Sequence, residues 1–372
     1  MLRKRQTAHL TVGEKSNECE LQSQNWLRAR FGVLLFTLIC LLALSITFAV
    51  TIGPVNISAS DVWKIIIYKT IGIGIYPEWP KSTEHIVWLI RLPRVLLAGL
   101  VGGGLAVVGA TMQALVRNLL ADPYILGVSS GASVGAVLVI VSGSFGVLGM
   151  FSLSIAAFVT GTLSFLVVLL LAQQRGHIAP NRILLAGIAV SYVCSAITSF
   201  LVVRSPDAEG VQSVLYWMLG SLCGTKWEYL TIPALVLAIG TIFLLLQSRS
   251  LNSMAMGDDT AVTLGINTNS FRRQLIIVAA IMTGAMVAVS GSIGFVGLMM
   301  PHIVRLLVGS DHRRVLPLSF FLGAIFLIWV DVLARVVVEP EELPVGIITA
   351  FLGAPFFLWL MRRSKYTFAG GC

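Results

Sequence analysis

Long apolar segments separated by short polar breaks constrain the fold of this chain more than any other feature. One of them, residues 95–115, is rich in glycine and is bounded by arginines, with Arg91 and Arg94 before it and Arg117 after it. At about 1.5 Å per residue, a helix of this length crosses the hydrocarbon core of a bilayer. In the next apolar segment, glycines recur at every fourth position, which favours close packing against another helix. The pattern predicts membrane helices that pack backbone to backbone.

Composition supports a polytopic membrane protein. Hydrophobic residues make up 56% of the chain and charged residues 12%, whereas a soluble domain carries roughly 25% charged residues. The net charge of +9 is spread singly and in pairs between apolar segments, which argues against nucleic acid as a partner. None of the five cysteines has CxxC spacing, so neither a disulfide framework nor a zinc site is predicted.

Hydropathy predicts an all-α protein with ten membrane helices. They are expected at about residues 31–52, 95–115, 124–141, 147–172, 182–203, 229–247, 274–292, 296–308, 315–336 and 344–361. The short segment 296–308 carries His302 and Arg305, which suit either a proton relay or an interfacial end of a partial helix. Outside the bilayer we expect a surface helix capped by Ser58 and a short helix at about residues 211–219.

The distribution of basic residues predicts the orientation. With the N-terminus inside, cytoplasmic segments hold 18 of the 26 lysines and arginines, as the positive-inside rule requires for both termini in the cytoplasm. The expected organisation is a cytoplasmic N-terminal segment (1–30), a transmembrane domain (31–363) containing a cytoplasmic loop (248–273), and a cytoplasmic tail (364–372). Ten helices would form two inverted five-helix halves, an arrangement found in transporters.

The cytoplasmic loop 248–273 is the longest polar connection between spans. Asp258 and Asp259 begin a helical pattern in it, Leu264 contributes to an apolar side, and Gly265 ends the pattern. Two interpretations are open. The segment is either a solvated loop helix or a docking surface for a cytoplasmic partner.

Motifs typical of catalysis occur in this sequence without the partner residues that catalysis requires. Ser129 stands in a G-x-S-x-G motif, but a nucleophile elbow requires a preceding strand and a histidine and an acid in reach. Asp331 is the one carboxylate clearly within a predicted span, and Arg335 follows it at the spacing that pairs side chains along a helix. A membrane-embedded enzyme is therefore the weakest of the functional classes.

The source of energy for transport is expected to lie on another chain. An ion-coupled secondary transporter, the second class considered, generally needs several ionisable groups at membrane depth. An ATP-binding loop of the form G-x-x-x-x-G-K-[ST] is absent, because none of the seven lysines follows a glycine. If ATP drives this protein, another polypeptide holds the nucleotide.

Several stretches resemble FecCD-type (BtuC-type) permeases, which are membrane subunits of ABC importers for ferric siderophores, heme and cobalamin. They are RLPR, GGGLAVVGATMQALVRNLLADPYILGVSSGA, DDTAVTLGI, GFVGLMMPHIVR, DVLAR and PVGIITAFLGAPFF. The resemblance covers roughly residues 30–363. It implies a type II importer permease in the bacterial cytoplasmic (inner) membrane that pairs with a second copy or a paralogue. The implied partners are two cytoplasmic ATPase subunits, which hold the ATP and Mg²⁺, and an external binding protein.

The resemblance also implies roles for individual residues, and no cofactor or metal on this chain. A metal chelate would pass between the two permease copies, with ferric siderophore as the first choice and heme or cobalamin as alternatives. Docking to the binding protein is assigned to Arg91, Arg94 and Arg335. Coupling to the ATPase is assigned to Met256, Gly257, Asp258, Asp259, Ala261, Leu264, Gly265 and Ile266. A cytoplasmic gate is assigned to Asn118, Leu120, Pro180 and Asn181, although Leu119 replaces the proline usual in relatives.

Overall fold

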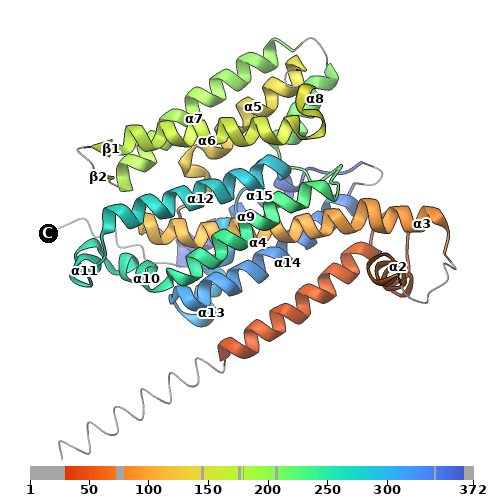
Figure 1. Cartoon of the computed structure of the whole chain (residues 1–372), viewed down its shortest axis with the longest axis horizontal. Coiled ribbons are helices and arrows are strands. Elements are labelled where there is room, and N and C mark those ends of the chain that lie inside the picture. Colours follow the sequence, from red (N-terminus) through yellow and green to blue (C-terminus); the bar gives the residue numbers. More distant parts are fainter. Residues whose placement is uncertain are drawn as a thin grey trace, which may run out of the picture.

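The fold is that of an all-helical membrane protein (Figure 1). This computed structural model describes residues 30–72, 79–143, 146–174, 177–178, 180–205, 208–338 and 341–363. Most of the segments predicted at the two termini, 1–30 and 364–372, lie outside the described residues. Within the described part, eight helices are long and apolar enough to span a membrane, and two shorter apolar helices join them. The ten helices predicted from hydropathy are confirmed.

The helices follow the order expected from the sequence. The first helix is Arg30–Thr51. The remaining elements are α2 (Ala59–Ile71), α3 (Lys81–His85), η1 (Ile86–Arg91), α4 (Leu92–Val116), η2 (Pro123–Leu126), α5 (Val128–Ser142), η3 (Gly146–Phe151), α6 (Ser152–Ala172), β1 (Gln173–Gln174), β2 (His177–Ile178), α7 (Pro180–Val203), α8 (Ala208–Met218), α9 (Glu228–Leu246), α10 (Ser248–Met256), α11 (Asp258–Thr263), α12 (Thr268–Ser290), α13 (Val296–Val308), α14 (His312–Val336) and α15 (Val345–Arg363). The two strands form a minimal antiparallel pair between α6 and α7.

Local chemistry explains several boundaries. The Ser58 hydroxyl accepts a hydrogen bond from the Asp61 amide and begins α2, as predicted, and Gly72 ends that helix in the left-handed region. The second membrane helix begins earlier than expected, because α3 and the π-helical η1 continue into α4 to give a helix from Lys81 to Val116. Gly127, with a φ of 73°, separates η2 from α5.

Helix α4 forms the centre of the molecule, and most of its residues are buried. It packs along α14 and α13, with α9 and α12 on its other sides (Figure 1). A Cβ on Gly102 would overlap the backbone of Gly323 in α14, and a Cβ on Gly109 would overlap that of Gly297 in α13. These helices approach so closely only because the contact positions lack side chains.

A second group of helices, α5, α6 and α7, packs against α12 with α8 at its end (Figure 1). The glycines repeated every fourth residue in α5 lie against α6, and a Cβ on Gly131 or Gly135 would overlap Ser164 or Thr160. The close-packing face predicted from this spacing is confirmed. In the first turn of α5, the Ser129 hydroxyl donates to the Ser292 hydroxyl at 2.8 Å.

The contact between Gly102 and Gly323 predicts a specific sensitivity to one added methyl group. Replacing Gly102 with alanine forces α4 away from α14, and we expect a loss of about 1–3 kcal/mol in the free energy of unfolding. Thermal unfolding of the purified protein in detergent measures the change.

The control is Gly99→Ala, one turn earlier on the same helix, where a Cβ would meet its nearest neighbour at 3.5 Å. Alanine also improves helix propensity by about 1 kcal/mol at such a position. We therefore expect Gly99→Ala to leave the melting temperature unchanged or slightly higher. Equal effects of the two substitutions would show that backbone contact does not hold α4 and α14 together.

Candidate functional site: the outer arginine cluster and the cytoplasmic coupling segment

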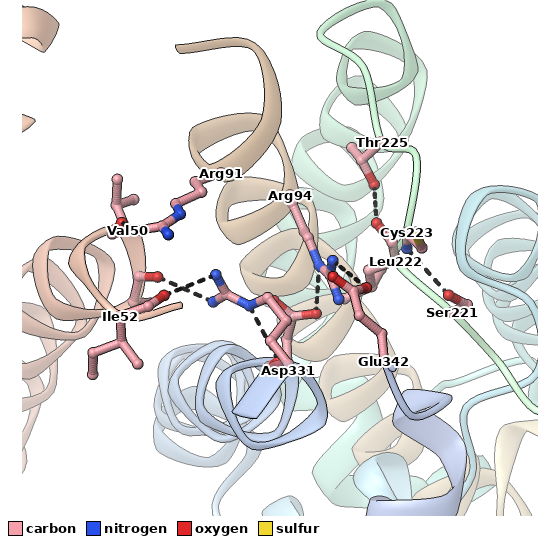
Figure 2. Close-up of polar contacts among 12 residues, drawn as sticks. Val50, Ile52, Arg91, Arg94, Ser221, Leu222, Cys223, Thr225, Asp331 and Glu342 are labelled. Carbon is pink, nitrogen blue, oxygen red and sulfur yellow. Dashed lines mark hydrogen bonds and ion pairs between the residues drawn. The ribbon is translucent and has the colours of Figure 1, made fainter. Parts of the chain in front are cut away.

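Arginines gather at the outer end of the helix bundle on the predicted topology, and Figure 2 shows two of them, Arg91 and Arg94. Arg91 precedes α4, Arg94 lies in its first turn, and Arg335 lies near the end of α14. Their exposed fractions are 5%, 5% and 4%. All three were predicted to face an external binding protein. In this structure all three side chains are buried, and their role in docking stays a prediction.

Two of these arginines bind the end of the first helix. Arg91 donates to the carbonyl oxygens of Val50 and Thr51, both at 2.9 Å, and Arg335 donates to those of Ala49 and Ile52 at 3.0 and 3.2 Å. The last carbonyls of a helix lack partners within it, and they carry the negative end of its dipole. The two guanidinium groups therefore cap the first helix and join it to α4 and α14.

A buried carboxylate joins the other contacts of the cluster (Figure 2). Asp331, with a fully buried side chain, accepts from Arg94 Nε at 2.8 Å and lies 3.2 Å from Arg335 Nε. The pairing of Asp331 and Arg335 along one helix face is confirmed. Arg94 also donates to Glu342 at 2.7 Å. These partners are more than 230 residues away from Arg94 in sequence, which explains why local sequence patterns did not reveal the burial.

The predicted coupling residues lie between positions 256 and 266, a stretch that we call the coupling segment. It lies at the opposite end of the bundle (Figure 1). Gly257 separates α10 from α11, Asp258 begins α11, and Gly265 follows it with a φ of 79°. The predicted short helix bounded by an aspartate and a glycine is confirmed. Asp259 is exposed, Ile266 is half-buried, and Ala261 is fully buried.

Asp258 bonds within the chain. Its carboxylate accepts from Arg272 at 2.9 and 3.1 Å, and it also pairs with Arg117, the residue that ends α4 in the left-handed region. Arg117 Nε donates to the carbonyl of Met254 at 3.1 Å. Asp258 therefore ties α11 to α4 and α12, whereas we had expected it to enter a groove on the ATPase. No local pattern in the sequence indicates that Arg117 and Arg272 bind this carboxylate.

Three apolar side chains of the segment are open to solvent. Met256, Val262 and Leu264 have exposed fractions of 75%, 58% and 63%. Met256 and Leu264 were among the predicted coupling residues, and Val262 was missed although it follows Ala261 directly. Exposed apolar side chains of one short segment, outside the bundle, are suited to burial against another protein.

The predicted gate is described only in part. Asn118 caps its own turn by accepting from the Leu120 amide at 2.9 Å. Pro180 and Asn181 form the start of α7, but their side chains lie outside the described residues. In the same turn, burial raises the pKa of the Asp122 carboxyl to about 6, while the hydrogen bond from the Tyr124 amide opposes this rise.

The fold defines a multi-pass membrane protein built from close-packed helices, with the arginine cluster at one end and the coupling segment at the other. Within the described residues, no group of three or more histidine, cysteine or acidic side chains is arranged to hold a metal ion. A model of the FecCD transport family matches residues 41–363. The chain belongs to this family, and it is a permease of the ABC importer type.

Relatives of known name support this membership. The chain is 43% identical over 283 residues to the cobalamin import system permease protein of Halobacterium salinarum, covering 76% of this chain and 75% of the relative. It is 42% identical over 293 residues to the hemin transport system permease protein of Yersinia pestis, covering 77% and 87%. A solved structure of a proposed metal-chelate type ABC transporter, in an inward-facing conformation, matches with a TM-score of 0.75 and 30% identity over 90% of this chain and all of that one.

The outer cluster predicts a large cost for removing its central charge. Asp331→Asn leaves the buried guanidinium of Arg335 without a carboxylate partner, and we expect a loss of about 3–5 kcal/mol in the free energy of unfolding. The melting temperature of the purified protein reports the loss.

Glu342→Gln is the matched control, because it removes the other carboxylate bound to Arg94 from a side chain that is 37% exposed. Solvent screens that pair, and we expect a loss of about 1 kcal/mol or less. Equal lowering of the melting temperature by Asp331→Asn and Glu342→Gln would refute the central role of Asp331 in the arginine cluster.

Proposed function

We propose that this chain is the permease subunit of an ATP-driven importer for a metal chelate, with a ferric siderophore as the first candidate. Two copies, or this chain and a paralogue, would enclose the translocation path in the bacterial cytoplasmic (inner) membrane. The observation that carries the proposal is the exposed apolar group of Met256, Val262 and Leu264 on the cytoplasmic side of a chain without a nucleotide-binding loop. Such a chain needs a separate motor and offers a surface on which one can dock.

The proposed assembly contains two cytoplasmic ATPase subunits and one external binding protein. ATP and Mg²⁺ would be held by the ATPase. The ion pairs of Asp258 with Arg117 and Arg272 tie α11 to α4 and α12, so movement of α11 by the ATPase would be transmitted to the central helix. The structure leaves the docking site of the binding protein unassigned, since the three arginines expected there are buried.

Heme and cobalamin are the second candidate substrates. They are supported by the names of two relatives that are more than 40% identical to this chain, the hemin and the cobalamin permease proteins. All three substrates are bulky chelates, and a path between two subunits suits them without a tight internal site. Selection among them would then reside in the external binding protein.

An ion-coupled mechanism receives less support. The carboxylate predicted within a span, Asp331, is paired with both Arg94 and Arg335. A carboxylate neutralised in this way is a poor carrier of protons or sodium ions, because binding either would break two ion pairs.

Backbone conformation at Gly265 provides a test of the coupling segment. Gly265 has a φ of 79° and open space around its Cα, so Gly265→Val strains the backbone without a steric clash. A left-handed conformation costs about 1–2 kcal/mol in an ordinary residue. We expect Gly265→Val to reduce ATP-dependent uptake strongly while the protein still inserts into the membrane.

Gly265→Asn serves as the control, because asparagine adopts the left-handed conformation readily. It should retain most of the uptake. Normal uptake by the valine variant, measured at equal amounts in the membrane, would count against a coupling role for this turn.

Reconstitution tests the function as a whole. Proteoliposomes containing this chain, its ATPase and its binding protein should accumulate a ferric siderophore only when ATP is supplied on the side of the membrane where the ATPase lies. Vesicles with this chain alone should accumulate none, even with an imposed proton or sodium gradient. Gradient-driven accumulation by the chain alone would overturn the proposal, and accumulation of hemin or cobalamin in place of the siderophore would assign the second candidate substrate.

A further inference from the structure

A cavity lies at the cytoplasmic end of the bundle, where the ends of α4, α10, α13 and α14 meet. Its volume is about 430 Å³. The polar residues that line it are Gln113, Arg117, Asn252, Arg305, Ser310, Asp311 and His312. The proposed transport function uses none of these residues except Arg117, which holds Asp258.

Arg305 is the unexplained group in this wall. It lies in the last turn of α13, is half-buried, and donates through one terminal nitrogen to the side-chain oxygen of Gln113. Among the described residues, no carboxylate lies within ion-pair distance of Arg305, in contrast to Arg94, Arg272 and Arg335. A guanidinium removed in part from water is costly unless an anion compensates it.

The remaining charges around the cavity do not supply that anion. The carboxylate of Asp311 begins α14 by accepting from the Arg313 amide at 3.1 Å, and it also accepts from Asn252 at 2.7 Å. The Nδ1 atom of His312 lies 2.7 Å from the side-chain oxygen of Asn252. The amide of His312 donates to the same Asn252 oxygen at 2.9 Å, so the start of α14 is capped from within the chain.

Apolar surface adjoins this polar site. Leu306 and Leu307, the residues after Arg305 on α13, have exposed fractions of 63% and 42%. Leu119 adds a further exposed apolar side chain at the wall. A cationic cavity beside an exposed apolar helix face matches a molecule with an anionic head and a hydrocarbon tail.

We propose that this cavity binds the headgroup phosphate of an anionic phospholipid from the cytoplasmic leaflet, with Arg305 as its principal ligand. Basic pockets between membrane helices on the cytoplasmic side are known to bind such headgroups. Lipid bound here would contact α4, α10, α13 and α14 together. The proposal needs the membrane location of the chain, and it does not depend on the proposed substrate or on ATP.

Lipid binding to the purified full-length chain tests this inference. Native mass spectrometry and thermal unfolding would compare phosphatidylglycerol with phosphatidylcholine, using wild type, Arg305→Gln, Arg305→Lys and Arg313→Gln. Arg313 is the matched control, because it is an exposed arginine on the same face that does not line the cavity. We expect Arg305→Gln to weaken phosphatidylglycerol binding roughly fivefold, as removal of one basic contact to an anionic lipid predicts. Arg305→Lys should keep most of the binding, and Arg313→Gln should change it little.

Three outcomes would overturn the proposal. The first is an equal effect of Arg305→Gln and Arg313→Gln on binding, which would reduce the site to a general surface charge. The second is stabilisation by inorganic phosphate alone that depends on Arg305 and matches that of the lipid, which would assign the cavity to a free anion. The third is loss of the bound lipid when the ATPase subunit is added, which would assign Arg305 to a carboxylate of that partner.

Discussion

Close contact between glycine-bearing helices is the constraint on which the rest of this structure depends. In a bilayer, apolar side chains gain little by leaving lipid for protein, so helices associate through van der Waals contact and hydrogen bonds. Helix α4 meets α14 at Gly102 and Gly323, and α13 at Gly109 and Gly297, with no side chain between the backbones. These contacts fix α4 as the axis around which both ends of the molecule are arranged.

The two ends of that axis carry the two charged clusters. At the outer end, Arg91 and Arg94 precede or begin α4 and bind the first helix, α14 and the segment before α15. At the cytoplasmic end, Arg117 terminates α4 and holds α11 through Asp258. A displacement of α11 by a cytoplasmic motor would therefore act on the helix whose far end joins the outer cluster, which gives a physical route between the two faces of the membrane.

Features determined by local chemistry could be predicted from the sequence. The apolar spans, the Ser58 cap, the glycine spacing of α5 and the turn at Gly265 each depend on a few neighbouring residues. The arginine cluster could not be predicted in the same way. A lone Arg91 or Arg335 at a helix end suggests exposure, and only the folded chain shows that the carbonyls of residues 49–52 lie within reach. The pairing of Asp258 with Arg117 was missed for the same reason, since 141 residues separate the two.

One rule for charge in a poorly solvated environment accounts both for the arginines that are compensated within the chain and for Arg305. Arg94 and Arg335 share Asp331, Arg272 binds Asp258, and Arg91 binds three carbonyl oxygens. Each of these guanidinium groups is bonded to acceptors within the chain and is therefore unavailable to a partner. Arg305 has only the neutral Gln113, and it borders a cavity large enough for a small anionic group. Because the same chain compensates its other buried guanidinium groups with carboxylates or with several carbonyl oxygens, the single neutral contact of Arg305 is better explained by an occupant from outside the chain than by tolerance of an uncompensated charge.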